Sequence, residues 1–168
     1  MEIDQQKYLK KWEDLVRRNE IQLEPEEYGV QMINHSPYYF ITNYGRVFSV
    51  YKWTTEWREL KRYKKQSANS KAKKSSANKQ PCVTLRISGK MRLLRISRLM
   101  REYFSLSSFN PANESEMECH HMEPVDDAFT NNHVDNLQMV GKKAHKKVLT
   151  PIQNAKLDGY LRLKVNAP

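Results

Sequence analysis

The stretch Glu118-Cys119-His120-His121-Met122-Glu123-Pro124, followed by Asn131-Asn132-His133-Val134-Asp135-Asn136-Leu137 and then by His145, decides how this chain is interpreted. It gathers His120, His121 and His145 with Asn136 in one short part of a chain that has only five histidines. Imidazoles bind divalent cations and exchange protons near neutral pH. The window therefore predicts a site for metal-assisted chemistry.

The charge of this 168-residue chain is distributed unevenly. Residues 1–28 hold eight acidic and five basic side chains, a balance of -3, whereas the remainder holds 24 Lys and Arg against 11 acids, a balance of +13. A positive surplus concentrated in this way favours a polyanionic partner, and nucleic acid is the natural one. A basic surface without any partner is the simpler alternative.

The sequence gives no sign of a membrane protein or a secreted one. No run approaches the roughly 18 apolar residues that a spanning helix needs, so we expect no membrane partner. The first residues lack the apolar stretch of a secretory signal. Cys82 and Cys119 are too few for a disulfide framework, which favours an intracellular, reducing compartment: the cytoplasm or a host cell, with an organelle or the nucleus as alternatives. Cys119 stands beside His120, yet a small buried residue on a strand is favoured over a metal ligand.

Changes in composition divide the chain into four predicted parts. They are an amphipathic helix in residues 1–28, a β-rich nucleic-acid-binding module in 29–114, a histidine-rich segment in 115–148 and a tail in 149–168. In the first part, apolar side chains fall at helical spacing over residues 5–20. These side chains are Tyr8, Leu9, Trp12, Leu15 and Val16. We expect this helix to pack on the body of the protein, with docking of a protein partner as the alternative.

The second part carries the signals of two hairpins. Residues 37–41 and 46–51 flank a predicted turn at Thr42-Asn43-Tyr44-Gly45, and residues 57–61 offer a third strand. Residues 83–87 and 91–96 flank the turn Ser88-Gly89-Lys90. Ser97 then has the residue type that caps a helix over residues 98–104.

Residues 61–80 carry eight positive charges and no acid, and they show no apolar period, so we expect a loop there. Such a segment can follow a phosphate backbone, although a plain solvated linker is the alternative. The side chains predicted to contact nucleic acid are Arg46, Arg58, Lys61, Arg62, Lys64, Lys65, Lys71, Lys73 and Lys74.

The spacing of the histidines suggests how they divide the chemistry. Adjacent strand residues point to opposite faces, so one of His120 and His121 can face a metal and the other a scissile phosphate. We expect a turn near Asn136 and a helix around residues 142–147, weakened at Gly141, which would bring His145 back toward His120. Asn136 would hydrogen-bond across the hairpin.

At this point four pieces resemble one family, the HNH endonucleases with their ββα-metal finger. The order of His120-His121, Asn132, Asn136-Leu137 and His145 resembles the HNH motif itself. The pieces upstream resemble the "Y-x-I-S-N-x-G-R-V-x-S" module and the "V-H-R-L-V-A-x-A-F" helix that precede the finger in phage-type and homing enzymes. Residues 39–49 carry the resemblance to the module, and residues 96–104 carry the resemblance to the helix. In addition, residues 131–140 resemble "N-N-x-x-x-N-L-R-W-V".

The resemblance implies an α+β fold, in which an N-terminal helix and a small antiparallel sheet precede a finger at residues 115–148. It implies a metal-dependent endonuclease that hydrolyses DNA phosphodiester bonds. His121 would be the general base that activates water, and His120 and His145 would bind the metal. Asn136 would orient the histidine or brace the loop. The cofactor would be one divalent cation, Mg²⁺ or Mn²⁺.

A second function uses the same scaffold without catalysis. In this alternative the chain is an inactive HNH-derived protein that binds nucleic acid, such as RNA in a ribonucleoprotein particle. The acidic N-terminal helix would then dock a protein partner.

Overall fold

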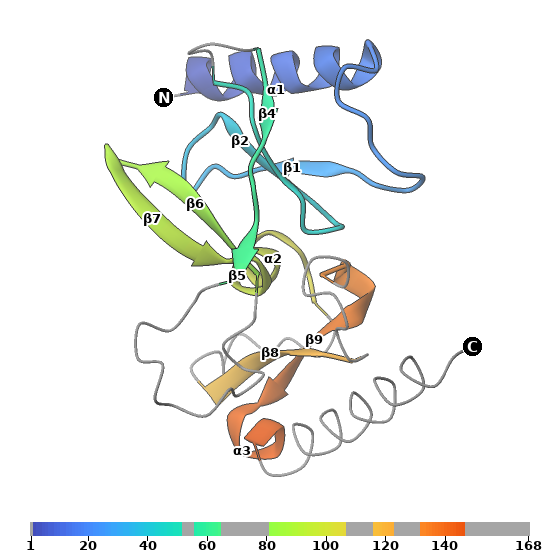
Figure 1. The fold of residues 1–168 in the computed structure, drawn as a ribbon, viewed down its shortest axis with the longest axis vertical. Coiled ribbons are helices and arrows are strands. Elements are labelled where there is room, and N and C mark those ends of the chain that lie inside the picture. Colours follow the sequence, from blue (N-terminus) through green and yellow to red (C-terminus); the bar gives the residue numbers. More distant parts are fainter. Residues whose placement is uncertain (1, 52–55, 65–80, 107–115, 123–131, 147–168) are drawn as a thin grey trace, which may run out of the picture.

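The computed structural model describes residues 2–51, 56–64, 81–106, 116–122 and 132–146. Helix α1 (Glu2–Arg17) is followed by four short strands: β1 (Gly29–Gln31), β2 (Tyr39–Thr42), β3 (Val47–Ser49) and β4 (Arg58–Glu59). These strands form one antiparallel sheet in the order β1-β2-β3-β4. Figure 1 shows α1 lying across the end of the molecule that holds this sheet.

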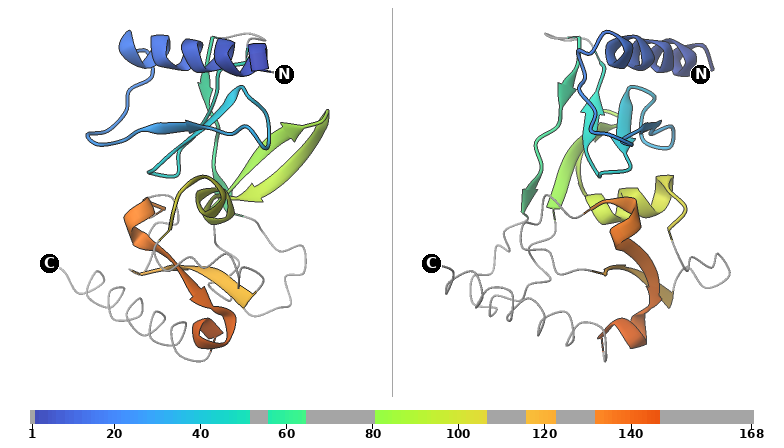
Figure 2. Two further views of the ribbon diagram at one scale, coloured as in Figure 1. Left: turned by 180° about the vertical axis from the view of Figure 1, so that it is seen from behind. Right: turned by 90° about the vertical axis from the view of Figure 1, so that its right-hand side faces the viewer.

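A second sheet and a helix form the middle of the molecule. Strands β5 (Tyr63–Lys64), β6 (Pro81–Ile87) and β7 (Lys90–Arg95) pair in that order, and helix α2 (Ile96–Tyr103) follows directly. The β6–β7 turn has positive φ at Ser88 and Gly89, as in a tight two-residue hairpin. Figure 2 shows this hairpin projecting from the body beside α2.

The histidine-rich segment forms the other end of the molecule. Strand β8 (Met117–His121) pairs antiparallel with β9 (Leu137–Gly141). A single 3₁₀ turn, η3 (Val134–Asn136), precedes β9, and the short helix α3 (Lys142–Ala144) follows it. This hairpin and helix are called the finger below. None of the helices in the described part of the chain could cross a membrane.

Two apolar clusters hold these pieces together. In the first, Trp12 of α1 stacks on Phe40 with ring centroids 4.6 Å apart, and it meets Phe48 edge-on. A Cβ atom at Gly29 would lie 2.4 Å from the Trp12 ring, so only glycine allows this close packing. Replacing a buried tryptophan by alanine typically costs about 3–5 kcal/mol, which gives the scale of this anchor.

The second cluster joins the finger to the rest. It contains Ile41 of β2, Leu85 of β6, Leu99 of α2 and Leu137 and Met139 of β9, all almost fully buried. Because one continuous core includes residues of both sheets and of the finger, the finger has a fixed place against the N-terminal sheet.

The α+β class with an antiparallel sheet ahead of the finger is confirmed by this arrangement. Some local predictions were wrong. Ser97 does not cap α2: the cap position is Arg95, no side chain caps it, and Ser97 is buried inside the helix. Ile96 belongs to α2 rather than to the preceding strand. Leu9 is 40% exposed rather than part of the packed face of α1.

Two further expectations need correction. The turn near Asn136 and the helix at Lys142 are present, but residues 137–141 between them form a strand. Leu137 and Met139 are buried while Gln138 and Val140 are only partly so, which is the two-residue period of a strand. The basic loop begins later than predicted, since Tyr63–Lys64 pairs with β6.

Candidate nuclease site

The two adjacent histidines lie at the end of β8, where the finger meets the core. His120 pairs with Gln138 and His121 with Leu137 across the β8–β9 ladder. Both imidazoles are buried, with 5% and 6% of the residue exposed. Consecutive strand residues point to opposite faces of the hairpin, so the two rings have different surroundings.

His121 is held by a buried amide. Its Nε2 atom lies 3.1 Å from Oδ1 of Asn132, and Asn132 is fully buried. With the hydrogen on Nε2, His121 donates to this oxygen, and Nδ1 keeps the lone pair that a base needs. Burial lowers the pKa of His121, the bond that His121 donates to Asn132 opposes that change, and the nearby His145 lowers the pKa further. The ring is therefore neutral, and able to accept a proton, at neutral pH.

His120 and His145 approach each other from different elements. Their ring centroids are 5.1 Å apart with the planes at 76°. Nδ1 of His145, the residue that follows α3 and is its C-cap, lies 3.0 Å from Oε2 of Glu118. The pKa of His120 is lowered by burial first, and then by His145 and His121.

The chemistry of these donors fits a divalent cation. Nδ1 of His120 is buried and lacks a hydrogen-bond partner, a costly state that coordination would relieve. A carboxylate on one nitrogen of an imidazole, as Glu118 provides for His145, fixes the tautomer that leaves the other nitrogen as a ligand. Among the described residues, however, no group of three or more His, Cys, Asp or Glu is placed to hold a metal. Within the described residues, His120 and His145 are the two side chains that would bind the cation, together with water and phosphate oxygens.

Asn136 and Asn132 divide the bracing role that the sequence suggested for Asn136. The backbone oxygen of Asn136 accepts from the N–H of Met122 at 2.9 Å, which closes the hairpin just after His121. A side-chain bond to His121 comes from Asn132, and the bracing role of the Asn136 side chain stays a prediction. Neither Asn132 nor Glu118 is assigned a role by the sequence pattern alone. The signal that could have found Glu118 is its position two residues before His120, which places both on one face of the strand.

Cys119 has the properties of a structural thiol. Burial raises its pKa to about 12, opposed by the charge of Arg101. A thiolate is the form that binds metal, so the favoured interpretation of Cys119 as a small packed residue agrees with its surroundings. His133 also lies apart from the ligands: its Nδ1 atom accepts from the N–H of Asp135 at 3.2 Å.

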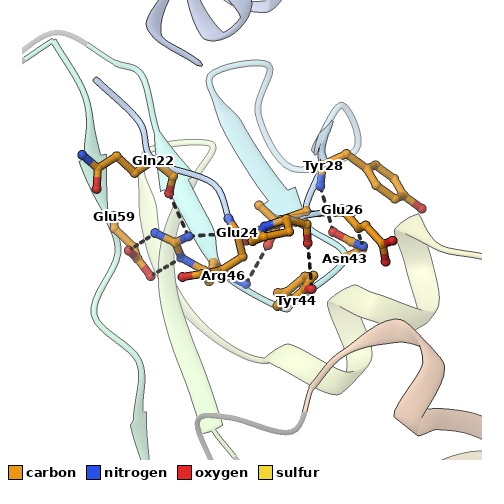
Figure 3. A network of polar contacts seen from close by, with 11 residues as sticks. Gln22, Glu24, Glu26, Tyr28, Asn43, Tyr44, Arg46 and Glu59 are labelled. Atoms are coloured by element: carbon orange, nitrogen blue, oxygen red, sulfur yellow. Dashed lines mark hydrogen bonds and ion pairs between the residues drawn. The ribbon is translucent and has the colours of Figure 1, made fainter. Parts of the chain in front are cut away.

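Arg46 is committed to carboxylates rather than open to a phosphate. Its guanidinium forms two bonds to Glu59, at 3.2 and 2.9 Å, and one of 2.9 Å to Glu27. It also donates to the backbone oxygen of Gln22 at 3.1 Å and lies over the Phe48 ring. Figure 3 shows Arg46, which directly precedes β3, between Glu59 of β4 and Gln22. The geometry opposes the predicted contact of Arg46 with nucleic acid.

The other predicted contacts fall into two groups. Arg58 and Lys61 are exposed, Arg62 is half-buried, and Lys64 belongs to β5. Lys65, Lys71, Lys73 and Lys74 lie outside the described residues. The projecting hairpin and α2 add exposed cations that the sequence interpretation did not assign: Arg86, Lys90, Arg92, Arg95 and Arg98.

The comparison with solved structures connects this geometry to a known fold. The chain is similar in structure to the HNH homing endonuclease I-HmuI, whose structure was solved to show how that enzyme binds and cleaves DNA. The TM-score is 0.52 and the sequence identity 16%, and the match covers 75% of this chain and 60% of the I-HmuI chain. The chain thus spans less than two thirds of that neighbour. No family model and no curated protein sequence matches the chain.

At this identity the likeness concerns the fold, so the predicted HNH fold is confirmed. The resemblance of residues 39–49 to the module that precedes such fingers stays a prediction.

Proposed function

We propose that this chain is a metal-dependent HNH endonuclease of the homing or phage type, which hydrolyses phosphodiester bonds in DNA. The observation that carries the proposal is the contrast between two adjacent histidines. His121 is fixed by Asn132 as a neutral base, and His120 meets His145 beside a carboxylate. The fold shared with I-HmuI supports the same conclusion.

In this mechanism the task of His121 is to remove a proton from water. The bond to Asn132 keeps the hydrogen on Nε2, so Nδ1 accepts the proton as the water attacks phosphorus. Rotation of the ring is limited by that bond and by burial, which keeps the base in one orientation. General bases of this kind contribute typically about 10²–10⁴-fold to the rate.

His120 and His145 would hold the cation, and Glu118 would orient His145 for that purpose. A bound divalent cation supplies positive charge that stabilises the leaving oxygen. Mg²⁺ and Mn²⁺ are the proposed ions. Between them Mn²⁺ suits imidazole ligands better, because Mg²⁺ prefers oxygen donors. The exposed cations Arg58 and Lys61 would contact the DNA backbone and position it without selecting a sequence.

The proposal is tested with supercoiled plasmid in Mg²⁺ or Mn²⁺. We expect nicking that stops in EDTA and in His121→Ala, while Lys10→Ala, on an exposed position of α1, cleaves like the wild type. Binding should weaken steeply with salt, since each phosphate contact releases counterions. A wild-type protein that binds DNA but leaves the plasmid intact with either ion overturns the proposal.

A non-catalytic nucleic-acid-binding protein on the same scaffold is the second candidate. The observation that favours it is the set of exposed cations on the β6–β7 hairpin and α2, which can contact phosphates without any metal. Salt-sensitive binding of DNA or RNA without cleavage, equal in the wild type and in His121→Ala, is the result expected for this function.

A further inference from the structure

We propose that the β2–β3 turn of the N-terminal sheet positions the general base: residues 43–45 hold Asn132, and Asn132 holds His121. The inference rests on the proposed function for its catalytic consequence, but the contacts themselves do not depend on it. Gly45 and Tyr44 are thereby positioning residues for a reaction that takes place on another sheet.

Three consecutive residues of the turn contact three consecutive residues of the finger, in reverse order along the chain. The backbone oxygen of Asn43 accepts from the N–H of Val134 at 2.8 Å. The Tyr44 ring stands perpendicular to the His133 ring with centroids 4.5 Å apart. Gly45 faces Asn132. Contacts at successive positions fix the finger segment against the turn along its length, rather than at a single point.

Gly45 is the tightest of these contacts. A Cβ atom there would lie 2.8 Å from Cβ of Asn132, 3.0 Å from Cγ2 of Ile96 and 3.3 Å from the backbone oxygen of Asn132. Two of these neighbours belong to Asn132 at or close to its backbone, so a side chain at position 45 pushes directly against Asn132. Gly45 also has φ +73°, which glycine adopts freely.

The turn itself is held firmly from its other side. The Asn43 side chain accepts from the N–H of Tyr28 at 2.9 Å and donates to the backbone oxygen of Glu26 at 3.1 Å. The Tyr44 hydroxyl donates to the backbone oxygen of Pro25 at 3.0 Å. Figure 3 shows these bonds beside the Arg46 network that closes the turn. Because these hydrogen bonds fix the turn, it forms a rigid surface for the segment of residues 132–134 that packs against it.

A displacement of Asn132 by a side chain at position 45 would directly change the position of the His121 imidazole. Asn132 is fully buried and its Oδ1 atom is bonded to the Nε2 atom of His121. A shift of Asn132 therefore lengthens that bond or turns the imidazole with it. Because a misplacement of about 1 Å can cost roughly 10²-fold in rate, a small movement is sufficient.

The chain offers a matched pair of glycines for the test. Gly45 has φ +73° and Gly89 φ +78°, so alanine at either site meets similar backbone strain. A Cβ atom at Gly89 would have nothing within 4 Å. The difference between Gly45→Ala and Gly89→Ala therefore separates the contacts with Asn132 and Ile96 from the strain, and the His121 resonances report whether Asn132 has moved.

We expect Gly45→Ala to nick plasmid roughly 10- to 100-fold more slowly than Gly89→Ala, with DNA affinity equal in the two variants. In ¹⁵N-histidine-labelled protein at one fixed pH, the His121 ring resonances should move in Gly45→Ala and stay in place in Gly89→Ala. Unmoved His121 resonances together with equal rates would overturn the proposal. If the wild type does not nick at all, the proposed function fails, and the resonances still decide whether the turn positions His121.

A second pair covers the case in which Gly45→Ala does not fold. Tyr44→Phe removes the bond to Pro25 but keeps the ring on His133, whereas Tyr44→Leu removes both. Movement of the His121 resonances in Tyr44→Leu but not in Tyr44→Phe supports the proposal. Identical spectra of the two variants contradict it.

Discussion

The Nε2 atom of His121 lies 3.1 Å from Oδ1 of Asn132, and this buried bond joins the end of β8 to the segment that leads into η3. It links β8 to the segment before η3 at the point where the proposed base is located. A ring bonded through Nε2 to an amide oxygen is held in one orientation, with its hydrogen on Nε2, and in the proposed function Nδ1 takes the proton.

Removing this tether should affect both stability and rate. Asn132→Ala leaves a buried imidazole N–H without its acceptor, which typically costs about 1–3 kcal/mol. The nicking rate should fall by roughly 10²-fold because the base loses its orientation. Urea unfolding and plasmid nicking measure the two effects.

Asn34→Ala is the control for the loss of an asparagine. Asn34 is exposed and donates to Glu102 at 3.2 Å, far along the chain from the finger. It should change neither the stability nor the rate appreciably. Equal behaviour of the two variants would show that the bond to His121 carries no function.

The carboxylate beside His145 should tune metal affinity. Glu118→Gln keeps the size of the side chain but removes the charge that lies 3.0 Å from Nδ1 of His145. Loss of such a carboxylate partner typically weakens metal binding by about 10- to 100-fold. Calorimetric titration with Mn²⁺ measures the metal affinity of each variant. Glu116→Gln is the matched control, since Glu116 is exposed just before β8. A Glu118→Gln affinity equal to that of Glu116→Gln would exclude this role.

The sequence predicted the finger and its histidines because those features are local. The spacing of His120, His121 and His145 is typical of few kinds of site. The turns at Gly45 and Gly89 follow from the conformational preference of glycine. The strand at residues 137–141 was not predicted, since only a turn near Asn136 and a helix around residues 142–147 were expected there, although Leu137 and Met139 alternate with less buried neighbours.

What the sequence could not predict depends on the approach of distant residues. Glu27 and Glu59 lie 19 and 13 positions from Arg46, so its pairing appears only after the strands are placed. A basic residue in a basic module suggests a phosphate ligand until its partners are known. The approach of Gly45 to Asn132 is of the same kind.

The protein without metal should lose stability as the pH falls. Burial lowers the pKa values of His120 and His121 below the usual 6.5. At a pH above the unfolded-state pKa, both imidazoles are neutral in the folded and in the unfolded chain, so they cause no loss of stability. Below about 6.5 the unfolded chain binds protons first, so the free energy of unfolding falls until the folded-state pKa values are passed.

Urea unfolding in EDTA between about pH 7 and pH 5 measures this slope. The double variant His120→Gln with His121→Gln should show a shallower dependence, because two of the groups that bind protons on unfolding are gone. A slope as steep as that of the wild type would mean that these two imidazoles titrate alike in both states.

Arg46 is expected to stabilise the fold and to leave DNA binding unchanged. The Glu27 side chain is fully buried, its Oε2 lies 2.9 Å from Nη1 of Arg46, and its Oε1 has no hydrogen-bond partner. Arg46→Met leaves this carboxylate buried without its cation, and breaking a buried pair in this way typically costs about 3–5 kcal/mol.

The double variant Arg46→Met with Glu27→Leu tests the cause, because removing both charges should recover much of the lost stability. Arg58→Met supplies the comparison for binding. Arg58 is exposed on β4, so its replacement should spare the fold yet lower the slope of log affinity against log salt by about 0.9 for each phosphate that Arg58 neutralises. The Arg46→Met protein, measured at a temperature where it is folded, should keep the wild-type slope. A reduced slope for Arg46→Met would return Arg46 to the surface that binds DNA.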